Sequence, residues 1–353
     1  MRLFQECGWR VVAGTSNDKD ADRLRQMGVI VSRIDFNRRG LTPKQDLIAL
    51  LKLGCLYLRY RPKLINHFHA KPTLFGNIAA WLLPRARIVN TVTGLGNVLG
   101  SRRFMRFLVA LGYRFSLKRS DITVFQNPDD RQLFVQKGWV REERTRVILS
   151  SGVDLQRFKT RKSTVSSSPC ILMVARLLWP KGVGEFVKAA EICKRSVPNA
   201  RFQLAGEFDP AHPDAVDKAW VDKQVKAGTI EFLGYLANME DRLPDVYVFV
   251  LPSYYREGVP RVLLEASACG VPVITADVPG CREALIPGQS GILVGPRNAQ
   301  ALADAIMKLL ADPALRNKMG ESARTFMERQ FDITTVAKEY TAIYRSLGIP
   351  IEF

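Results

Sequence analysis

Short apolar runs alternate with longer amphipathic stretches along most of this chain of 353 residues. Unbroken apolar runs between turn residues are typical of parallel strands buried on both faces, and apolar positions at helical spacing are typical of helices packed on such a sheet. The pattern therefore predicts an α/β protein with parallel sheets. In the first half, strands are expected at residues 10–13, 29–34, 64–68, 87–92, 122–126 and 147–149.

Helical spacing fills the segments between these runs. Helices are expected near residues 18–27, 43–59, 74–83, 101–115 and 129–137, and two last helices at 313–330 and 333–347. Strand and helix alternate from residue 170 to about residue 310, and residues 160–169 are rich in serine and threonine, as flexible linkers are. A chain of this length is expected to form two domains. We predict domains at 1–160 and 161–330, and a separate last segment at 331–353.

The beginning of the chain departs from this scheme. A doubly wound domain opens with a central strand and a glycine-rich turn, whereas Met1–Cys7 has the pattern of a helix end that Gly8 closes. We therefore expect the first domain to lack its first strand, its glycine-rich loop and part of its first helix.

Two glutamates after a predicted strand carry the most functional information. The apolar run Val246–Leu251 leads into a loop with Glu257 and Gly258, and Pro260 opens a helix in which Glu265 lies further along. Ligands of open α/β sheets bind at the carboxyl ends of strands, where a helix N-terminus favours phosphate. Two carboxylates beside a phosphate pocket suit a nucleotide sugar, which has hydroxyl groups on both sides of its diphosphate. The spacing alone fits two surface glutamates equally well.

A second pair of charged residues lies in one strand-to-helix loop. The apolar strand that begins at Cys170 ends at Arg176, and Lys181 follows just before a helix over residues 183–195. A guanidinium fork and an ammonium group in one loop can hold the same diphosphate. Alone, the motif fits two solvated cations better, but its presence in the same domain as the two glutamates favours a diphosphate site.

The charge is divided unevenly along the chain. Residues 1–160 contain 29 Lys and Arg against 12 Asp and Glu, a net charge of +17, and the remaining residues contain 23 against 22, a net charge of +1. A strongly basic half indicates an anionic partner. Because the chain has no zinc-finger spacing and no basic zipper, we expect no nucleic acid. An anionic membrane surface is the expected partner.

One predicted helix supports a membrane partner. Residues 101–115 mix arginines with large apolar side chains, a composition that lets a helix lie among lipid headgroups. A helix packed in the core with exposed arginines fits the same residues equally well. The membrane-facing candidates are Arg102, Arg103, Phe104, Arg106 and Phe107.

Other sequence features bear on compartment and cofactors. No segment reaches about 18 uncharged apolar residues, and no signal peptide is visible. The six cysteines show no paired spacing, which is typical of reduced thiols, and the three histidines form no metal-binding cluster. We expect a cytoplasmic protein, peripheral at the inner face of the cell membrane, with no metal and no cofactor. The sequence does not indicate an oligomeric state.

These motifs together resemble a known family. Arg176 with Lys181, and Glu257 with Glu265, resemble the signature of retaining glycosyltransferases of family 4. That family has the GT-B fold, two Rossmann-like domains with a cleft between them. Residues 152–158, 277–283 and 291–294 also fit it, and residues 68–72 and 90–96 resemble the branch that extends undecaprenyl-diphosphate-linked sugars, which includes N-acetylgalactosaminyltransferases acting on bacillosamine. The resemblance covers nearly the whole chain.

The resemblance implies roles for individual residues. Arg176 and Lys181 would stabilise the leaving diphosphate, Glu257 would hold the donor hexose, and Glu265 would accept hydrogen bonds from ribose. The other donor-side candidates are Gly258, Val259, Pro260 and Tyr235, and the acceptor-side candidates are His69, Lys71, Thr93 and Gly94. Tyr235 fits core packing or plain exposure as well, and a structural role is favoured for His67. Many family members have histidine where this chain has Thr93, which argues against an imidazole base. The segment 331–353 would cross back to the first domain.

The expected activity follows from the resemblance. A retaining, metal-independent glycosyltransferase would move an N-acetylhexosamine or related hexose from a UDP-sugar to a polyprenyl-diphosphate-linked sugar, in surface polysaccharide or glycan assembly. One alternative is a truncated, inactive remnant that binds only nucleotide or membrane, which the missing first strand suggests. Another is a nucleotide-sugar epimerase, against which the scarcity of histidines counts.

Overall fold

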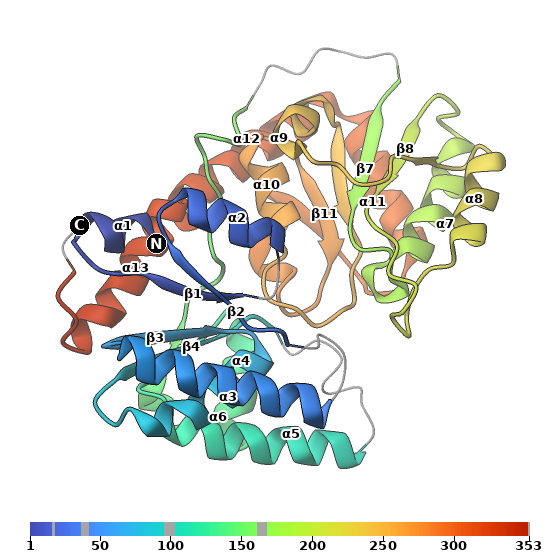
Figure 1. Ribbon diagram of the computed structural model, residues 1–353. Helices are drawn as coiled ribbons and strands as arrows, with labels where there is room; N and C mark the ends of the chain where they lie inside the picture. Colours follow the sequence, from blue (N-terminus) through green and yellow to red (C-terminus); the bar gives the residue numbers. More distant parts are fainter. Residues whose placement is uncertain (16–17, 37–41, 95–102, 161–167, 352–353) are drawn as a thin grey trace. The chain divides into compact units, whose positions relative to one another are not determined.

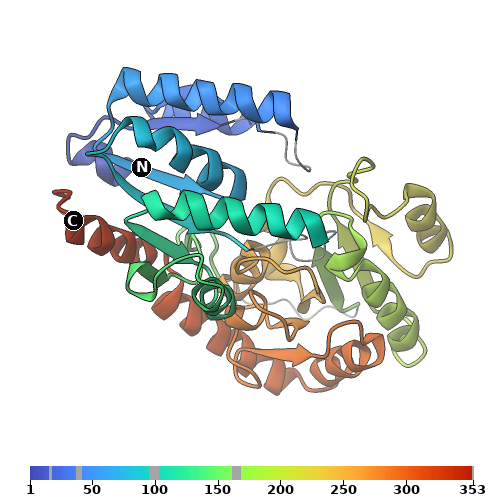
Figure 2. The ribbon, with the colours of Figure 1, turned by 90° about the horizontal axis from the view of Figure 1, so that it is seen from below.

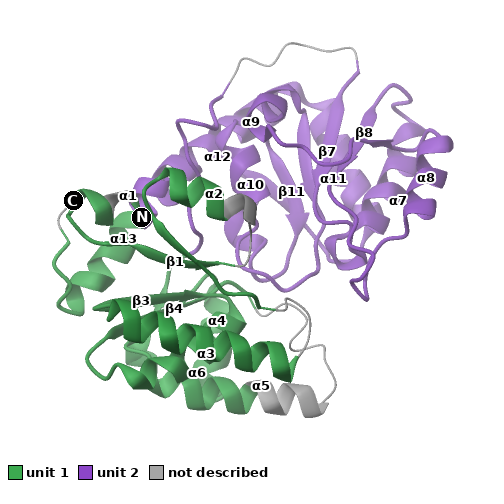
Figure 3. Cartoon of the chain, viewed as in Figure 1, with its two compact units in different colours: residues 1–148, 337–353 green, residues 149–336 purple. Residues whose placement is uncertain are grey.

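The computed structural model describes residues 1–15, 18–36, 42–94, 103–160 and 168–351 (Figure 1). The chain forms two compact units, residues 1–148 with 337–353 (unit 1) and residues 149–336 (unit 2) (Figure 3). Unit 2 begins before residue 160 because Val153, Leu155 and Phe158 are buried in its core. The two units are described separately below.

Unit 1 contains two parallel sheets. The larger sheet has the order β3-β4-β5-β6, and the smaller one pairs β1 with β2. The strands are β1 (Val12–Thr15), β2 (Ile30–Arg33), β3 (Leu64–Phe68), β4 (Arg87–Val92), β5 (Ile122–Phe125) and β6 (Thr145–Val147). β3 and β4 have the predicted bounds, whereas β1 lies slightly after the predicted strand and β6 slightly before it. Ile88, Val89 and Val124 are completely buried, as expected for central strands of a parallel sheet.

Helices of unit 1 pack against these sheets. They are α1 (Arg2–Glu6), α2 (Asp18–Gln26), α3 (Pro43–Tyr60), α4 (Ala70–Ala79), α5 (Arg103–Ser116) and α6 (Pro128–Gln136), with 3-10 turns η1 (Ala80–Leu82), η3 (Leu117–Arg119) and η4 (Glu142–Arg144). Asn127 is the N-cap of α6, because its side chain accepts a hydrogen bond from the Asp130 amide at 2.7 Å. The predicted helix at 74–83 is wrong at its start. It begins at Ala70, because Pro72 lies in the first turn, where no amide hydrogen is needed.

The end of the chain packs against unit 1. Residues 337–346 belong to α13 (Ile333–Ser346), and the hydroxyl of Tyr344 accepts a hydrogen bond from Nδ2 of Asn66 in β3 at 2.5 Å. The hydroxyl of Tyr340 lies 3.2 Å from Oγ1 of Thr91 in β4. The last segment is thus hydrogen-bonded to β3, at the edge of the larger sheet, and to its neighbour β4.

Unit 2 is a doubly wound domain with one six-stranded parallel sheet. The strand order is β12-β11-β10-β7-β8-β9, so the order reverses between β7 and β10. The strands are β7 (Cys170–Val174), β8 (Arg201–Ala205), β9 (Glu231–Phe232), β10 (Val248–Leu251), β11 (Val273–Ala276) and β12 (Gly291–Val294). In such sheets, the ligand site lies at the carboxyl ends of the strands where the order reverses.

Helices cover the sheet of unit 2. They are α7 (Val183–Lys194), α8 (Lys218–Lys226), α9 (Met239–Arg242), α10 (Arg261–Ala268), α11 (Ala299–Ala311) and α12 (Pro313–Gln330), with 3-10 turns η5 (Trp179–Lys181), η6 (Leu243–Asp245) and η7 (Arg282–Ala284). α12 has the predicted bounds. Pro260 was expected as the first helical residue, but it is the N-cap of α10, with an extended backbone. Among the described residues, no helix is both long enough and apolar enough to cross a bilayer.

A buried hydrogen-bonded histidine lies in the core of unit 1. Nδ1 of His67 lies 2.8 Å from Oδ1 of Asn90, so this nitrogen carries the hydrogen, and Nε2 accepts from the Tyr57 hydroxyl at 2.7 Å. Burial lowers the pKa of His67 to about 4, and the ring is therefore neutral at pH 7. Gly76 of α4 leaves room for it, since a Cβ there would lie 2.2 Å from Nε2.

Gly76→Ala should therefore lower the free energy of unfolding by about 1–3 kcal/mol, because the new methyl group displaces the buried ring. Gly184→Ala in α7 is the matched control. Its Cβ would meet Trp179 at an ordinary 3.6 Å, and the helix should gain about 1 kcal/mol. Urea denaturation of both variants tests this expectation, and a stable Gly76→Ala protein would contradict it.

Candidate functional site

The site in unit 2 is built from two loops at the reversal of strand order. Residues 175–182 follow β7, and residues 252–260 follow β10. The loops touch, since the Tyr254 amide donates to the Pro180 carbonyl at 2.9 Å. Gly182 has a left-handed backbone (φ 84°), and a Cβ there would lie 2.4 Å from the Pro252 carbonyl oxygen. Only glycine allows this close approach.

Lys181 and Glu257 form an ion pair between the two loops. The ammonium Nζ lies 2.5 and 2.6 Å from the two carboxylate oxygens, and the side chains are 9% and 20% exposed. The Ser253 hydroxyl lies 3.2 Å from Oε1 of Glu257, and Nζ lies 5.3 Å from the centre of the Tyr255 ring. Each charge compensates the other in a place with little water. The sequence predicted both residues in the site but not their contact.

Arg176 lies in the same loop but has a different neighbour. Its side chain is 54% exposed, and Nη1 lies 4.0 Å from Oδ2 of Asp209, at the limit of an ion pair. The guanidinium therefore remains largely hydrated. Arg176 and Lys181 share the loop as predicted, but they do not share a partner, so their joint contact with one diphosphate stays a prediction.

Glu265 lies on α10, with its side chain 13% exposed. Burial raises the pKa of this carboxyl, and the nearby positive charges of Arg261 and Arg157 partly oppose the rise. Arg261 lies 3.4 Å from Oε1 of Glu265. Glu240 orients Arg157 through two hydrogen bonds of 2.9 Å. The two arginines thus favour the ionised form of Glu265, which can accept hydrogen bonds from a hydroxyl-bearing ligand.

Sequence reasoning missed Arg157, Glu240 and Ser253. Arg157 lies inside the segment 152–158 that carries part of the resemblance, but nothing in the sequence distinguishes it from the other basic residues. Ser253 is fully buried beside Glu257, and its only signal was its place directly after a strand. The contact between Arg157 and Glu240 joins residues that are far apart in the chain.

The other donor-side candidates lie around the same loop. Gly258, Val259 and Pro260 are buried where the loop joins α10, and Tyr235 is 66% exposed after β9. A Cβ on Gly280 would lie 2.2 Å from the Glu257 carbonyl oxygen, so the loop after β11 also closes on this segment. The backbone around Glu257 is therefore held from two sides.

The acceptor-side candidates of unit 1 lie at the carboxyl ends of β3 and β4. Exposed His69 caps α4 with φ 71° and ψ 167°, a conformation that costs a non-glycine residue about 1–3 kcal/mol. Nδ1 of His69 lies 2.5 Å from Oγ1 of Thr93. Gly94 follows with φ 103°. Lys71, the remaining acceptor-side candidate, forms an ion pair of 2.7 Å with buried Asp46.

The membrane-facing candidates lie at the start of α5. Arg102 lies outside the described residues. Arg103, Phe104, Arg106 and Phe107 lie on α5 as expected, but their side chains lie outside the described part of the structure. Within the described residues, no group of His, Cys, Asp or Glu has the arrangement of a metal site.

Comparisons with known proteins agree with this architecture. The model of the family described as "Glycosyl transferase 4-like domain" matches residues 1–149, and that described as "Glycosyl transferases group 1" matches residues 156–326. Structures of Anabaena Alr3699/HepE in complex with UDP have the same fold, with a TM-score of 0.80, 21% identity, and coverage of 98% of this chain and 94% of that one. The fold and the two family domains define a GT-B glycosyltransferase.

The chain belongs to the glycosyltransferase family that combines these two domains, and it is a transferase. It is 29% identical to N,N'-diacetylbacillosaminyl-diphospho-undecaprenol alpha-1,3-N-acetylgalactosaminyltransferase of Campylobacter jejuni, over 93% of this chain and 88% of the relative. It is 24% identical to the capsular polysaccharide biosynthesis glycosyltransferase CapM of Staphylococcus aureus, with the same coverage. A 23% identical relative from Escherichia coli is UDP-Gal:alpha-D-GlcNAc-diphosphoundecaprenol alpha-1,3-galactosyltransferase, over 87% of this chain and 81% of the relative.

Lys181→Ala and Arg176→Ala should each lower glycosyl transfer by roughly 10²–10³, the usual cost of losing one donor to developing charge. Lys181→Ala should also lower the thermal stability, because it leaves the carboxylate of Glu257 buried without its partner. Arg176 is half exposed, so its loss should leave the stability unchanged.

Lys188→Ala, which removes an exposed lysine from α7, is the control for a plain loss of charge. Initial rates and melting curves of the three variants separate the roles. Unchanged transfer in both site variants would remove them from the site.

Proposed function

We propose that the protein transfers an N-acetylhexosamine or related hexose from a UDP-sugar to a polyprenyl-diphosphate-linked sugar, with retention of configuration and without a metal ion. The observation that carries the proposal is the Lys181–Glu257 pair at the reversal of strand order, with Glu265 on the helix that follows. The names of two relatives support the acceptor class, since they specify diphospho-undecaprenol-linked sugars. The UDP-bound solved structures support the donor class.

Stabilising the leaving diphosphate is the main task of the protein in this reaction. The bond between the anomeric carbon and the diphosphate oxygen breaks, and a bond to the acceptor hydroxyl oxygen forms on the same face. The departing diphosphate takes the acceptor's proton, so no imidazole base is needed at Thr93. Negative charge grows on the diphosphate, where nearby cations lower the barrier.

Lys181 can serve two partners at once. Its ammonium has three N–H groups, and the two oxygens of Glu257 account for two of them. The third can donate to a phosphate oxygen. Glu257 thereby positions Lys181, while its carboxylate and the adjacent backbone at Gly258 and Val259 face the donor hexose. Arg176 adds a second, hydrated cation at the mouth of the loop.

Glu265 binds the nucleoside part of the donor. A carboxylate at this place can accept hydrogen bonds from both ribose hydroxyls, and the charges of Arg261 and Arg157 oppose the rise in its pKa that burial causes. In unit 1, the exposed His69–Thr93 pair would receive the acceptor sugar. Because the acceptor is lipid-linked, we place the protein at the cytoplasmic face of the membrane as a peripheral protein.

The relatives favour transfer over the alternatives. The three relatives named above are transferases, which counts against a nucleotide-sugar epimerase. An inactive remnant would still bind UDP through Glu265 but would form no product. Incubating the protein with radiolabelled UDP-sugars and a membrane extract separates these functions. Lipid-linked radioactivity is the expected result, and UDP binding with no product would overturn the proposal.

Glu265→Gln should weaken UDP binding about tenfold, because a neutral amide replaces a charged acceptor facing ribose. Glu257→Gln should leave UDP binding nearly unchanged and lower turnover, since its partners are the hexose and Lys181. Titration calorimetry with UDP and initial rates on both variants test this division. Glu321→Gln, on an exposed part of α12, is the control. Equal losses of UDP affinity in both site variants would contradict it.

A further inference from the structure

Large apolar side chains are exposed on one group of neighbouring helices in unit 1. α3, α4 and α5 lie side by side, with η1 at the end of α4 (Figures 1 and 2). Trp81 is 55% exposed, Phe115 52% and Leu51 60%. We call this surface the α3–α5 apolar face, and its members are Leu47, Leu51, Leu58, Ile78, Trp81, Leu82, Leu111 and Phe115. Exposed apolar groups that gather in this way mark an interaction surface.

These side chains form a continuous row. Leu47, Leu51 and Leu58 follow helical spacing on α3, and Gly54 occupies the remaining position of that stripe. A Cβ on Gly54 would lie 3.3 Å from a methyl group of Leu82, so Leu82 covers the stripe at this point. Trp81, directly before Leu82 in the chain, stacks on Phe115 of α5, with ring centres 6.5 Å apart. Leu111 lies one turn before Phe115 on α5.

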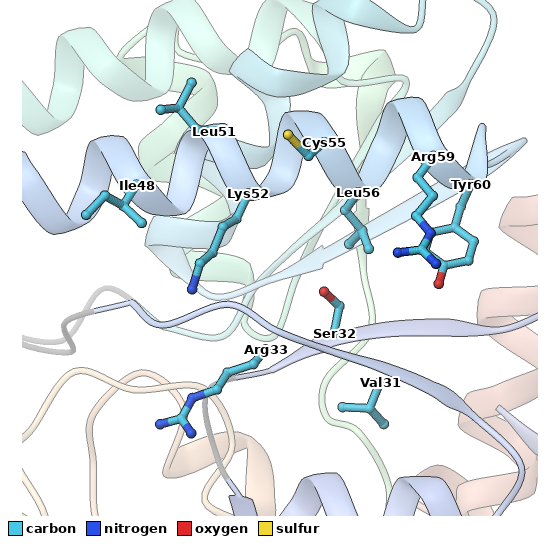
Figure 4. Close-up of a pocket in the computed structure, with 10 residues that line it drawn as sticks. All are labelled: Val31, Ser32, Arg33, Ile48, Leu51, Lys52, Cys55, Leu56, Arg59 and Tyr60. Atoms are coloured by element: carbon cyan, nitrogen blue, oxygen red, sulfur yellow. The ribbon is translucent and has the colours of Figure 1, made fainter.

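A cavity adjoins the α3–α5 apolar face at Leu51, which lines the cavity and belongs to the face. That cavity, of about 510 Å³, lies between α3 and β2. Figure 4 shows Lys52 directed toward Arg33 across it.

Basic side chains surround the α3–α5 apolar face. Arg59, Arg85, Arg114 and Lys118 are exposed, and each lies within four residues of a member of the face. The segment 1–160 that contains them has a net charge of +17. Long basic side chains beside Trp and Leu are typical of surfaces that lie in the headgroup region of an anionic bilayer.

We propose that the α3–α5 apolar face docks on an anionic lipid bilayer, with Trp81 and Phe115 inserted at the level of the headgroups. The inference rests on the proposed function only in that a lipid-linked acceptor gives the contact a purpose. A second copy of the chain is disfavoured as the occupant, because two such basic segments would repel each other. Exposed apolar residues of unit 2 are fewer and come from separate elements, namely Val225, Tyr235, Ile286 and Ile333.

The first test is flotation of the full chain with vesicles of phosphatidylethanolamine and phosphatidylglycerol. The double variant Trp81→Ser with Phe115→Ser should bind about tenfold or more weakly, because two partly inserted aromatic groups are lost. The control, Val225→Ser with Ile286→Ser, changes two exposed apolar residues of unit 2 and should bind like the parent. Melting curves confirm that both double variants are folded.

The second test follows Trp81 itself. Vesicles that contain brominated acyl chains should quench part of the tryptophan fluorescence of the parent. In Trp81→Phe that part should disappear while binding persists, because phenylalanine keeps the apolar contact. Identical quenching in both proteins would overturn the proposal even if the Ser variants lose binding.

These measurements are independent of the transfer reaction. If no lipid-linked product forms but the parent floats and the Ser variant does not, the docking surface stands and the proposed function fails. If the Ser variant transfers sugar to a short, water-soluble prenyl-diphosphate acceptor but not to a vesicle-bound one, the docking surface and the proposed function are both supported. Unchanged flotation of the Ser variant overturns the docking surface, as does a parent dimer in light scattering that the same substitutions dissolve.

Discussion

The ion pair between Lys181 and Glu257 is the contact on which the candidate site of unit 2 depends. It joins the two loops that leave β7 and β10, where the strand order of the sheet reverses. Both side chains are largely withdrawn from water, so neither charge could lie there without the other. The approach of the two loops requires Gly182, because any side chain at that position would collide with the Pro252 carbonyl. The ion pair of the candidate site therefore depends on a backbone constraint.

In unit 1, buried polar side chains are either neutral or paired with an opposite charge. His67 is kept neutral between Tyr57 and Asn90, and Lys71 is compensated by Asp46. His69 remains exposed at the end of the same strand. Its strained backbone is maintained by the surrounding structure, as is common at binding sites. Basic and apolar side chains that are not part of the core lie exposed on the helices of unit 1.

The elements that were predicted with correct bounds are those with the clearest local signals. β3 and β4 are short strands that each begin shortly after a bend or turn and contain the apolar residues Ile65, Ile88 and Val89, and α12 begins at Pro313 directly after its cap Asp312. The start of α4 was misplaced: the helix was expected from residue 74, but it begins at Ala70, with Pro72 in the first turn, where proline is tolerated. Loops that directly follow strands were located correctly, since their position depends only on where the strand ends.

The sequence by itself determined the α/β architecture, the family, and the two loops that carry Arg176, Lys181 and Glu257, because these features depend on residues close together in the chain. Only the tertiary structure decided which charges meet. Lys181 pairs with Glu257, Lys71 pairs with Asp46, and Arg157 lies near Glu265. The exposed row from Leu51 to Phe115 likewise became visible only in the fold. Contacts and exposure depend on how distant segments pack, and local sequence patterns carry no information on that packing.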